Sequence, residues 1–194
     1  MRLLVITLVV VLIGPNVSAR TDTSYTIELH ATVAPSFSLF EHERYPGASD
    51  QMMFGYAFTL RAMWHPGRML AVGLMTGYTR IASETLPSDS LTVFPFPTRA
   101  TLTSVPLQAV VSMQGPNLEV GVGMGPHLVY STLRDHNPAQ GTRLELNLTL
   151  LTSYRWMLTP DVSVASELRA SYFSYRGVFS IQPSLTIRYD LFRY

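Results

Sequence analysis

Strict alternation of apolar and polar side chains is the feature that most limits how this chain can fold. From Tyr25 to Leu39 every odd position is apolar or proline, whereas the even positions begin with Thr26 and Glu28. Successive side chains of a β-strand point to opposite faces, so a period of two gives one apolar and one polar face. A helix would require apolar spacings of three and four, which this segment lacks. The segment is therefore predicted to be a strand.

Seven further segments follow the same period, and turn residues such as Pro66 and Gly67 separate them. Each segment is long enough for a tilted strand to cross a bilayer, which requires about 9–11 residues. The pattern predicts an all-β fold, an eight-stranded antiparallel up-and-down transmembrane β-barrel. The predicted strands cover approximately residues 25–39, 52–64, 70–78, 101–113, 118–130, 144–156, 162–172 and 179–191.

The connections between these strands alternate in length. Those after the second, fourth and sixth strands are tight, and most of the others are longer, as in outer-membrane barrels with short periplasmic turns and longer outer loops. Both termini are then expected on the periplasmic side. The predicted outer loops are Glu41–Asp50, Ala82–Thr98, Arg134–Arg143 and the short Ser174–Val178.

Aromatic residues on the apolar face gather near the predicted strand ends. Aromatic girdles at both membrane interfaces are typical of transmembrane barrels, and a soluble barrel has no reason to sort its aromatics in this way. The predicted periplasmic rim holds Tyr25, Trp64, Trp156 and Tyr189. The predicted outer rim holds Phe37, Phe54, Tyr78, Tyr130, Tyr172 and Phe179.

The two faces differ enough to decide which one points outward. The polar face carries glycine and charged residues, which suit the narrow interior of eight strands, whereas the bulky apolar face suits lipid. A secreted lipocalin-like ligand carrier, with its apolar face inward, is the less favoured alternative. The predicted interior charges nearly balance, so we expect a plugged barrel whose charges pair; an ion-conducting lumen is the alternative. These charges are Arg61, Arg155, Arg169 and Arg188 against Glu28, Glu119, Glu145, Glu167 and Asp190.

The first 19 residues have the pattern of a secretory signal peptide. Met1-Arg2 precedes an apolar run from Leu3 to Ile13, and Val17-Ser18-Ala19 supplies small residues for cleavage. The division is then a signal peptide at 1–19 and one outer-membrane barrel domain at 20–194. The chain has no cysteine, which excludes a lipoprotein anchor at the cleavage site and any disulfide. A net charge of +1 without a basic run argues against a nucleic-acid partner.

Two neighbouring segments resemble a known family. Val105-Pro106-Leu107-Gln108-Ala109-Val110-Val111, a tight turn, and Val120-Gly121-Val122-Gly123-Met124-Gly125-Pro126 resemble the outer-membrane β-barrel domain family of small OmpA/OmpX-type barrels. The local resemblance covers the fourth and fifth predicted strands, and the architecture is similar over residues 20–194. Membership implies an integral protein of the cell outer membrane with no assigned ligand or reaction.

The C-terminus partly matches the signal by which such barrels are recognised for insertion by the barrel-assembly machinery. Tyr194 is a terminal aromatic residue and Phe192 lies two positions before it. The apolar phase through Tyr189 and Leu191 is one residue out of step with that ending. We therefore expect either a bulge near Leu191 or final residues that lie beyond the sheet.

No segment predicts catalysis, a cofactor or a metal. The glycines from Gly121 to Gly125 lie within a predicted strand and have the wrong spacing for a dinucleotide-binding loop. The histidines lack metal-ligand spacing, and those on the polar face, His30 and His127, are expected to make interior hydrogen bonds. Ser131, Asp135 and His136 cluster near the third outer loop, so a lipid-modifying acyl hydrolase is the alternative function. We assign no catalytic, cofactor-binding or metal-binding residue and predict a structural or surface-interaction barrel in contact with outer-membrane lipid.

The second outer loop, residues 82–98, is unusually apolar. Its stretch Leu91–Pro97 contains two phenylalanines and two prolines. Packing against the barrel rim is the favoured interpretation, because isolated apolar patches on loops are uncommon. Contact with an extracellular partner through this loop is the alternative.

Overall fold

The structure is a computed structural model that describes residues 25–40, 52–66, 69–86, 98–134, 139–174 and 177–193. Among these residues, no helix is long and apolar enough to cross a membrane. The predicted signal peptide at residues 1–19 lies outside the described residues. The strands are β1 (Thr26–Phe40), β2 (Met52–His65), β3 (Leu70–Leu86), β4 (Thr98–Gln114), β5 (Leu118–Arg134), β6 (Ala139–Met157), β7 (Val162–Phe173) and β8 (Val178–Arg193).

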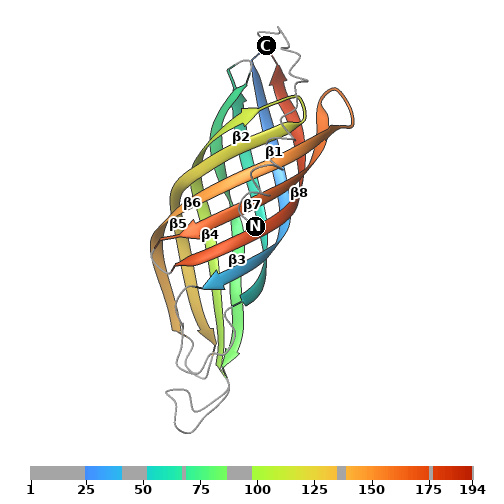
Figure 1. The fold of residues 1–194 in the computed structure, drawn as a ribbon. Coiled ribbons are helices and arrows are strands. Elements are labelled where there is room, and N and C mark those ends of the chain that lie inside the picture. The colour runs from blue at the N-terminus through green and yellow to red at the C-terminus, as the bar shows by residue number, and fades with distance from the viewer. Residues whose placement is uncertain are drawn as a thin grey trace, which may run out of the picture.

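The eight strands form one closed barrel in which each strand pairs antiparallel with its neighbours in the chain, and β8 pairs with β1 (Figure 1). Following register partners once around the barrel from Ile27 on β1 returns to β1 at Phe37, ten residues further along. With about 3.3 Å per residue and about 4.8 Å between strands, this shift corresponds to a strand tilt of about 40°. The predicted fold class is confirmed.

The outer connections are shorter than the sequence predicted. The loop expected at 82–98 is wrong at both ends, because β3 continues to Leu86 and β4 already begins at Thr98. The loop expected at 134–143 is likewise reduced, because β6 begins at Ala139. These strands run past the point where the apolar–polar alternation ends, and hydrogen bonding to a neighbouring strand holds them extended. The loop predicted at 41–50 lies outside the described residues.

The pairing of β1 with β8, which closes the barrel, contains a bulge. Ile27 pairs with Phe192 whereas the next residue, Glu28, pairs with Asp190, so Leu191 is the extra residue. Leu191 and Phe192 are both exposed on the outside as a result. The bulge predicted near Leu191 is confirmed, and it explains why the apolar phase shifts by one residue before the C-terminus.

Candidate membrane surface and barrel interior

The outside of the barrel is apolar along almost the whole length of the strands. On β6 the exposed side chains of Leu146, Leu148 and Leu150 alternate with the buried side chains of Asn147 and Thr149. The same alternation holds on the other strands, so the predicted assignment of faces is confirmed. The barrel is closed and so has no free strand edge along this wall, and its outer side chains are apolar. Insertion into lipid requires both properties.

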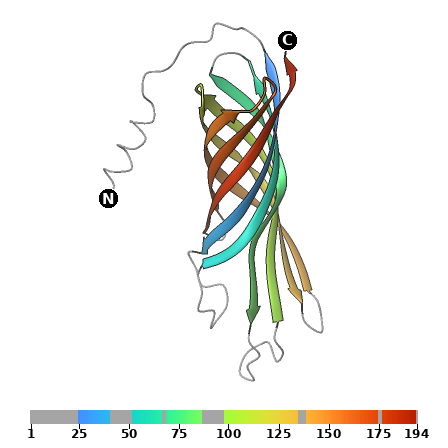
Figure 2. The same ribbon diagram turned by 90° about the vertical axis from the view of Figure 1, so that its right-hand side faces the viewer.

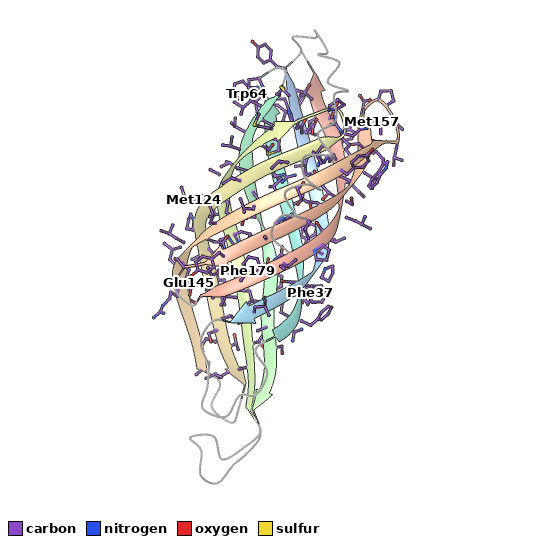
Figure 3. All side chains as sticks on the ribbon, in the orientation of Figure 1. Phe37, Trp64, Met124, Glu145, Met157 and Phe179 are labelled. Carbon is purple, nitrogen blue, oxygen red and sulfur yellow. The ribbon has the colours of Figure 1, made fainter. Side chains whose placement is uncertain are left out.

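Aromatic side chains mark both ends of this wall. At the end of the barrel where β1 begins and β8 ends, the rings of Tyr25 and Trp64 stack with centroids 6.5 Å apart. At the same end, the rings of Tyr154 and Trp156 meet edge-on at 5.0 Å. Trp64 and Met157 lie toward this end, and Phe37 and Phe179 lie well along the barrel toward the other (Figure 3).

The opposite end carries a second set of aromatic contacts. Phe37 meets Phe54 edge-on at 5.5 Å, and the rings of Tyr56 and Tyr78 lie 6.1 Å apart. The predicted place of Tyr130 in this outer set is wrong. Tyr130 pairs with Thr142 on β6, beyond Asn147, the last β6 residue paired to β7, and so lies farther out.

The interior is crossed by a network of buried ion pairs. Glu167 accepts hydrogen bonds from Arg169 at 2.6 Å and from Arg61 at 3.0 Å. Glu119 lies 2.7 Å from Arg188 and 3.6 Å from Arg61. Arg61 on β2 therefore bridges carboxylates from β5 and β7, across the width of the lumen. Each of these buried charges has a partner of opposite sign, as the desolvation cost of a narrow interior demands.

A second branch of the network runs through His30. Arg61 donates from Nε to His30 Nδ1 at 3.2 Å, which requires Nδ1 to be unprotonated. The ring proton is then on Nε2, which donates to Glu28 at 2.9 Å. Glu28 also lies 3.3 Å from His65 and 3.5 Å from Arg155. All four predicted interior arginines thus join the network, together with three of the five predicted acids; Glu145 and Asp190 make other interactions.

Uncharged polar groups occupy the next level of the lumen. Gln108 donates to Asn147 at 2.7 Å and to Thr149 at 3.1 Å, and Thr149 contacts Ser171 at 3.0 Å. These bonds connect β4, β6 and β7. At this level, hydrogen bonds connect polar side chains from different strands across the lumen.

Two apolar clusters inside the barrel were not predicted from the sequence. Both interrupt the polar phase of their strands, and this interruption is the signal that could have revealed them. One cluster lies among Met63, Ala71, Met75, Val110 and Leu151. The other lies toward the outer end and consists of Ile81, Ala82, Leu102, Val129, Phe173 and Val178. A bulge in β3 between Arg80 and Ala82 turns both Ile81 and Ala82 inward, which fills the lumen at this level.

Four strands continue beyond the rest of the barrel at the outer end. Pairing of β2 with β3 ends at Tyr56 and Arg80, and pairing of β6 with β7 ends at Asn147 and Phe173. Pairing among β3, β4, β5 and β6 continues farther, to Leu86 with Thr98 and to Leu133 with Ala139. We call residues 81–86, 98–103, 130–134 and 139–146 of these strands the β3–β6 extension. It stands out on one side of the barrel (Figure 2).

Of the three residues considered for catalysis, the structure describes Ser131 alone. Ser131 lies on β5 opposite Leu102, and Asp135 and His136 lie outside the described residues. A different serine, Ser104, lies 3.3 Å from His127 Nδ1 inside the lumen. Both side chains are buried, and the His127 ring meets Phe173 edge-on at 5.0 Å. This contact is the interior hydrogen bond predicted for His127, and it lies beneath the outer apolar cluster.

Neither a protein-family model nor a curated protein sequence matches the chain. Solved structures of small barrels do match. Neisserial surface protein A superposes with a TM-score of 0.57 at 14% identity, covering 88% of this chain and 100% of that one. Ail, the attachment invasion locus protein of Yersinia pestis, gives a TM-score of 0.57 at 10% identity, covering 90% and 100%. A major outer membrane protein of Thermus thermophilus gives 0.54 at 12% identity, covering 87% and 99%. The chain therefore has the fold of small OmpA/OmpX-type outer-membrane barrels.

Proposed function

We propose that this chain is an integral outer-membrane protein that presents a surface-interaction site, with the β3–β6 extension and the loop between β3 and β4 as its contact region. The observation that carries this proposal is the one-sided extension. Residues 139–144 of β6 are exposed on both faces, so this part of β6 covers no core. Strand length beyond what the bilayer needs does not contribute to closing the barrel.

The outer edge of β6 offers backbone groups to a partner strand. Ser174 N donates to Leu146 O at 3.3 Å, so the backbone polar groups of Leu146 point toward β7. In an antiparallel ladder the direction of these groups alternates along the strand. The N–H and C=O groups of Leu144, Thr142 and Gln140 therefore point to the same side, past the end of β7. Addition of an extended segment to such an edge is a common mode of peptide recognition.

The interior supports this proposal over a transport role. The ion-pair network, the uncharged polar layer and two apolar clusters occupy successive parts of the lumen. Eight strands leave an interior just wide enough for side chains to fill. Among the described residues of the lumen, Ser104 and His127 form the pair that most resembles part of a hydrolase site. Both are buried beside Phe173, so this pair does not favour the alternative function of a lipid-modifying hydrolase.

Surface display in a non-adherent Gram-negative host would test this role. One of the similar structures is Ail in complex with a heparin analogue, at a TM-score of 0.53, so immobilised heparin is a suitable first surface. Cell–cell association is the second assay. We expect cells that display the chain to adhere in at least one assay. Replacing residues 88–97 by a short Gly-Ser linker, or Thr142 by Pro, should abolish adhesion.

The controls separate adhesion from assembly. Thr142→Ala keeps the backbone N–H of the β6 edge and should adhere like the original chain, whereas Thr142→Pro removes that donor. Heat-modifiable gel mobility should show that all variants insert and close. Adhesion that is absent from the original chain, or retained by both altered chains, would contradict the proposal. Failure of the shortened chain to assemble would mean that residues 88–97 belong to the barrel.

A further inference from the structure

Arg80 is the first charged residue met along the outward face of β3. The outward positions before it, from Leu70 to Tyr78, carry no charge and end at the outer aromatic set. Arg80 lies two residues beyond Tyr78, a rise of about 5 Å on a strand tilted by about 40°. On β3 the apolar wall ends here, and in the outer-membrane placement proposed above we expect the lipid headgroups at this level.

The ring of Tyr56 lies beside the Arg80 side chain on the outside of the barrel, and Tyr78 packs next to Tyr56. The guanidinium carbon of Arg80 lies 5.9 Å from the centroid of the Tyr56 ring, and the Tyr56 ring lies 6.1 Å from that of Tyr78. Both tyrosines are exposed on the lipid-facing wall. Thr103, the register partner of Arg80 on β4, adds a hydroxyl on the same face. The arrangement places a cation, two tyrosine rings and a threonine on neighbouring outward positions of β2, β3 and β4.

Among the residues that the structure describes, the guanidinium of Arg80 has no carboxylate of its own. The ion pairs of the network described above all lie inside the barrel, and none includes Arg80. Arg80 Nε is buried without a hydrogen-bond partner. The interior arginines, by contrast, are each matched by glutamate. A cation on the outer wall without an acid is available to bind an anion from its surroundings.

We propose that Arg80, Tyr56, Tyr78 and Thr103 form a binding site for the phosphorylated headgroup of an outer-leaflet lipid. A guanidinium binds phosphate through two parallel N–H donors, and tyrosine and threonine hydroxyls can donate to the remaining oxygens. The exposed rings of Tyr56 and Phe58 on the membrane side of Arg80 contact the acyl chains. The inference uses the outer-membrane placement proposed above but does not depend on the surface-interaction role.

Native mass spectrometry of the refolded chain in detergent micelles tests this site. The chain is titrated with bisphosphorylated lipid A, with the same lipid lacking its phosphates, and with inorganic phosphate alone. We expect the bisphosphorylated lipid to bind most tightly, and Arg80→Gln to raise its apparent Kd about tenfold, as the loss of one charge-assisted contact does. Tyr56→Leu should raise the Kd by about two- to fivefold, because it removes the cation–π contact.

Arg143→Gln is the matched control, because it removes the same charge from an exposed position on the β3–β6 extension. It should bind the lipid like the original chain, and all variants should keep heat-modifiable mobility. Equal affinity of Arg80→Gln and the original chain for the bisphosphorylated lipid would overturn the site. Equal occupancy by inorganic phosphate would make it a soluble-anion site and overturn the assignment to a lipid. If a variant loses adhesion but its refolded chain still binds the lipid, only the surface-interaction proposal is contradicted.

Discussion

Two consecutive leucines of β6 lie in different environments. Leu150 is 54% exposed on the outer wall, whereas Leu151 is 2% exposed and packs in an apolar cluster inside the lumen. Residue type cannot distinguish these positions; only the phase of the strand does. Substitutions at single positions should therefore have effects that depend on the face and on the height along the strand.

Replacing Leu150 by Arg should destabilise the protein strongly. Leu148 pairs with Tyr172, one of the aromatic residues predicted at the outer rim. Leu150 is the next lipid-facing residue of β6 on the periplasmic side of Leu148, so it lies closer to the middle of the bilayer. A charge on the lipid-facing wall near the midplane costs about 2–4 kcal/mol. Urea unfolding in liposomes, followed through the fluorescence of Trp64 and Trp156, measures the free energy of unfolding.

Leu144→Arg provides the comparison for this effect. Leu144 has the same residue type, strand and face, but it lies on the β3–β6 extension, where we expect a cost below about 1 kcal/mol. Equal losses for the Leu150 and Leu144 variants would show that the membrane boundary is placed wrongly.

Removing one member of a buried ion pair should also be costly. Arg188 lies 2.7 Å from Glu119, and both side chains are almost fully buried. Arg188→Met leaves Glu119 with Arg61 at 3.6 Å and the hydroxyl of Ser153 at 3.2 Å, and we expect a loss of about 3–5 kcal/mol, typical of removing one partner of a buried ion pair. The same urea titration measures it.

Arg155→Met tests whether burial causes that loss. The Arg155 side chain is 20% exposed and lies 3.5 Å from Glu28, so its removal should cost about 1 kcal/mol or less. The double variant Arg188→Met with Glu119→Leu should recover much of the stability lost by Arg188→Met, since the carboxylate that the single variant leaves without its closest partner is gone. A double variant as unstable as the single one would contradict this explanation.

At the level of strands, the sequence predicted all eight elements and the face that each turns outward. This succeeded because lipid and lumen impose opposite chemistry on alternate positions of a membrane-spanning strand. The outer ends of β3 and β6 were missed for the same reason. Residues 139–144 are exposed on both faces, so no alternation marks them as a strand. The interior face and the pairing of its charges were predicted, but not which residues pair, because the partners depend on the ten-residue shift around the barrel.

Gly125 should be indispensable for the fit between β4 and β5. A Cβ at this position would lie 2.2 Å from the carbonyl oxygen of Leu107, a backbone atom that cannot move aside. Gly125→Ala should therefore reduce the yield of folded protein and destabilise what does fold by about 1–3 kcal/mol, as overpacking does. Heat-modifiable mobility after refolding measures the yield.

Gly141 on the β3–β6 extension is the matched position. A Cβ there meets nothing within 4 Å, so Gly141→Ala should fold like the original chain. Normal folding of both alanine variants would mean that β4 and β5 can separate locally without loss.

For the whole molecule, we expect the filled lumen to prevent ion flow. The network centred on Arg61 spans the lumen from β2 to β5 and β7, and apolar residues fill the space nearer the outer end. Purified protein in planar bilayers should give no steady conductance, with a wide porin as the positive control. Large, stable and reproducible channels would show that the lumen opens or that the strands rearrange into a wider pore.

The unequal strand lengths make the outer end of this barrel asymmetric. In the outer-membrane placement proposed above, a molecule that moves within the outer leaflet meets long strands on the side of β4 and β5 and shorter strands where β7, β8 and β1 end (Figure 2). Rotation of the protein about the membrane normal therefore changes what it can touch, and a tethered partner on another surface would meet it in one orientation.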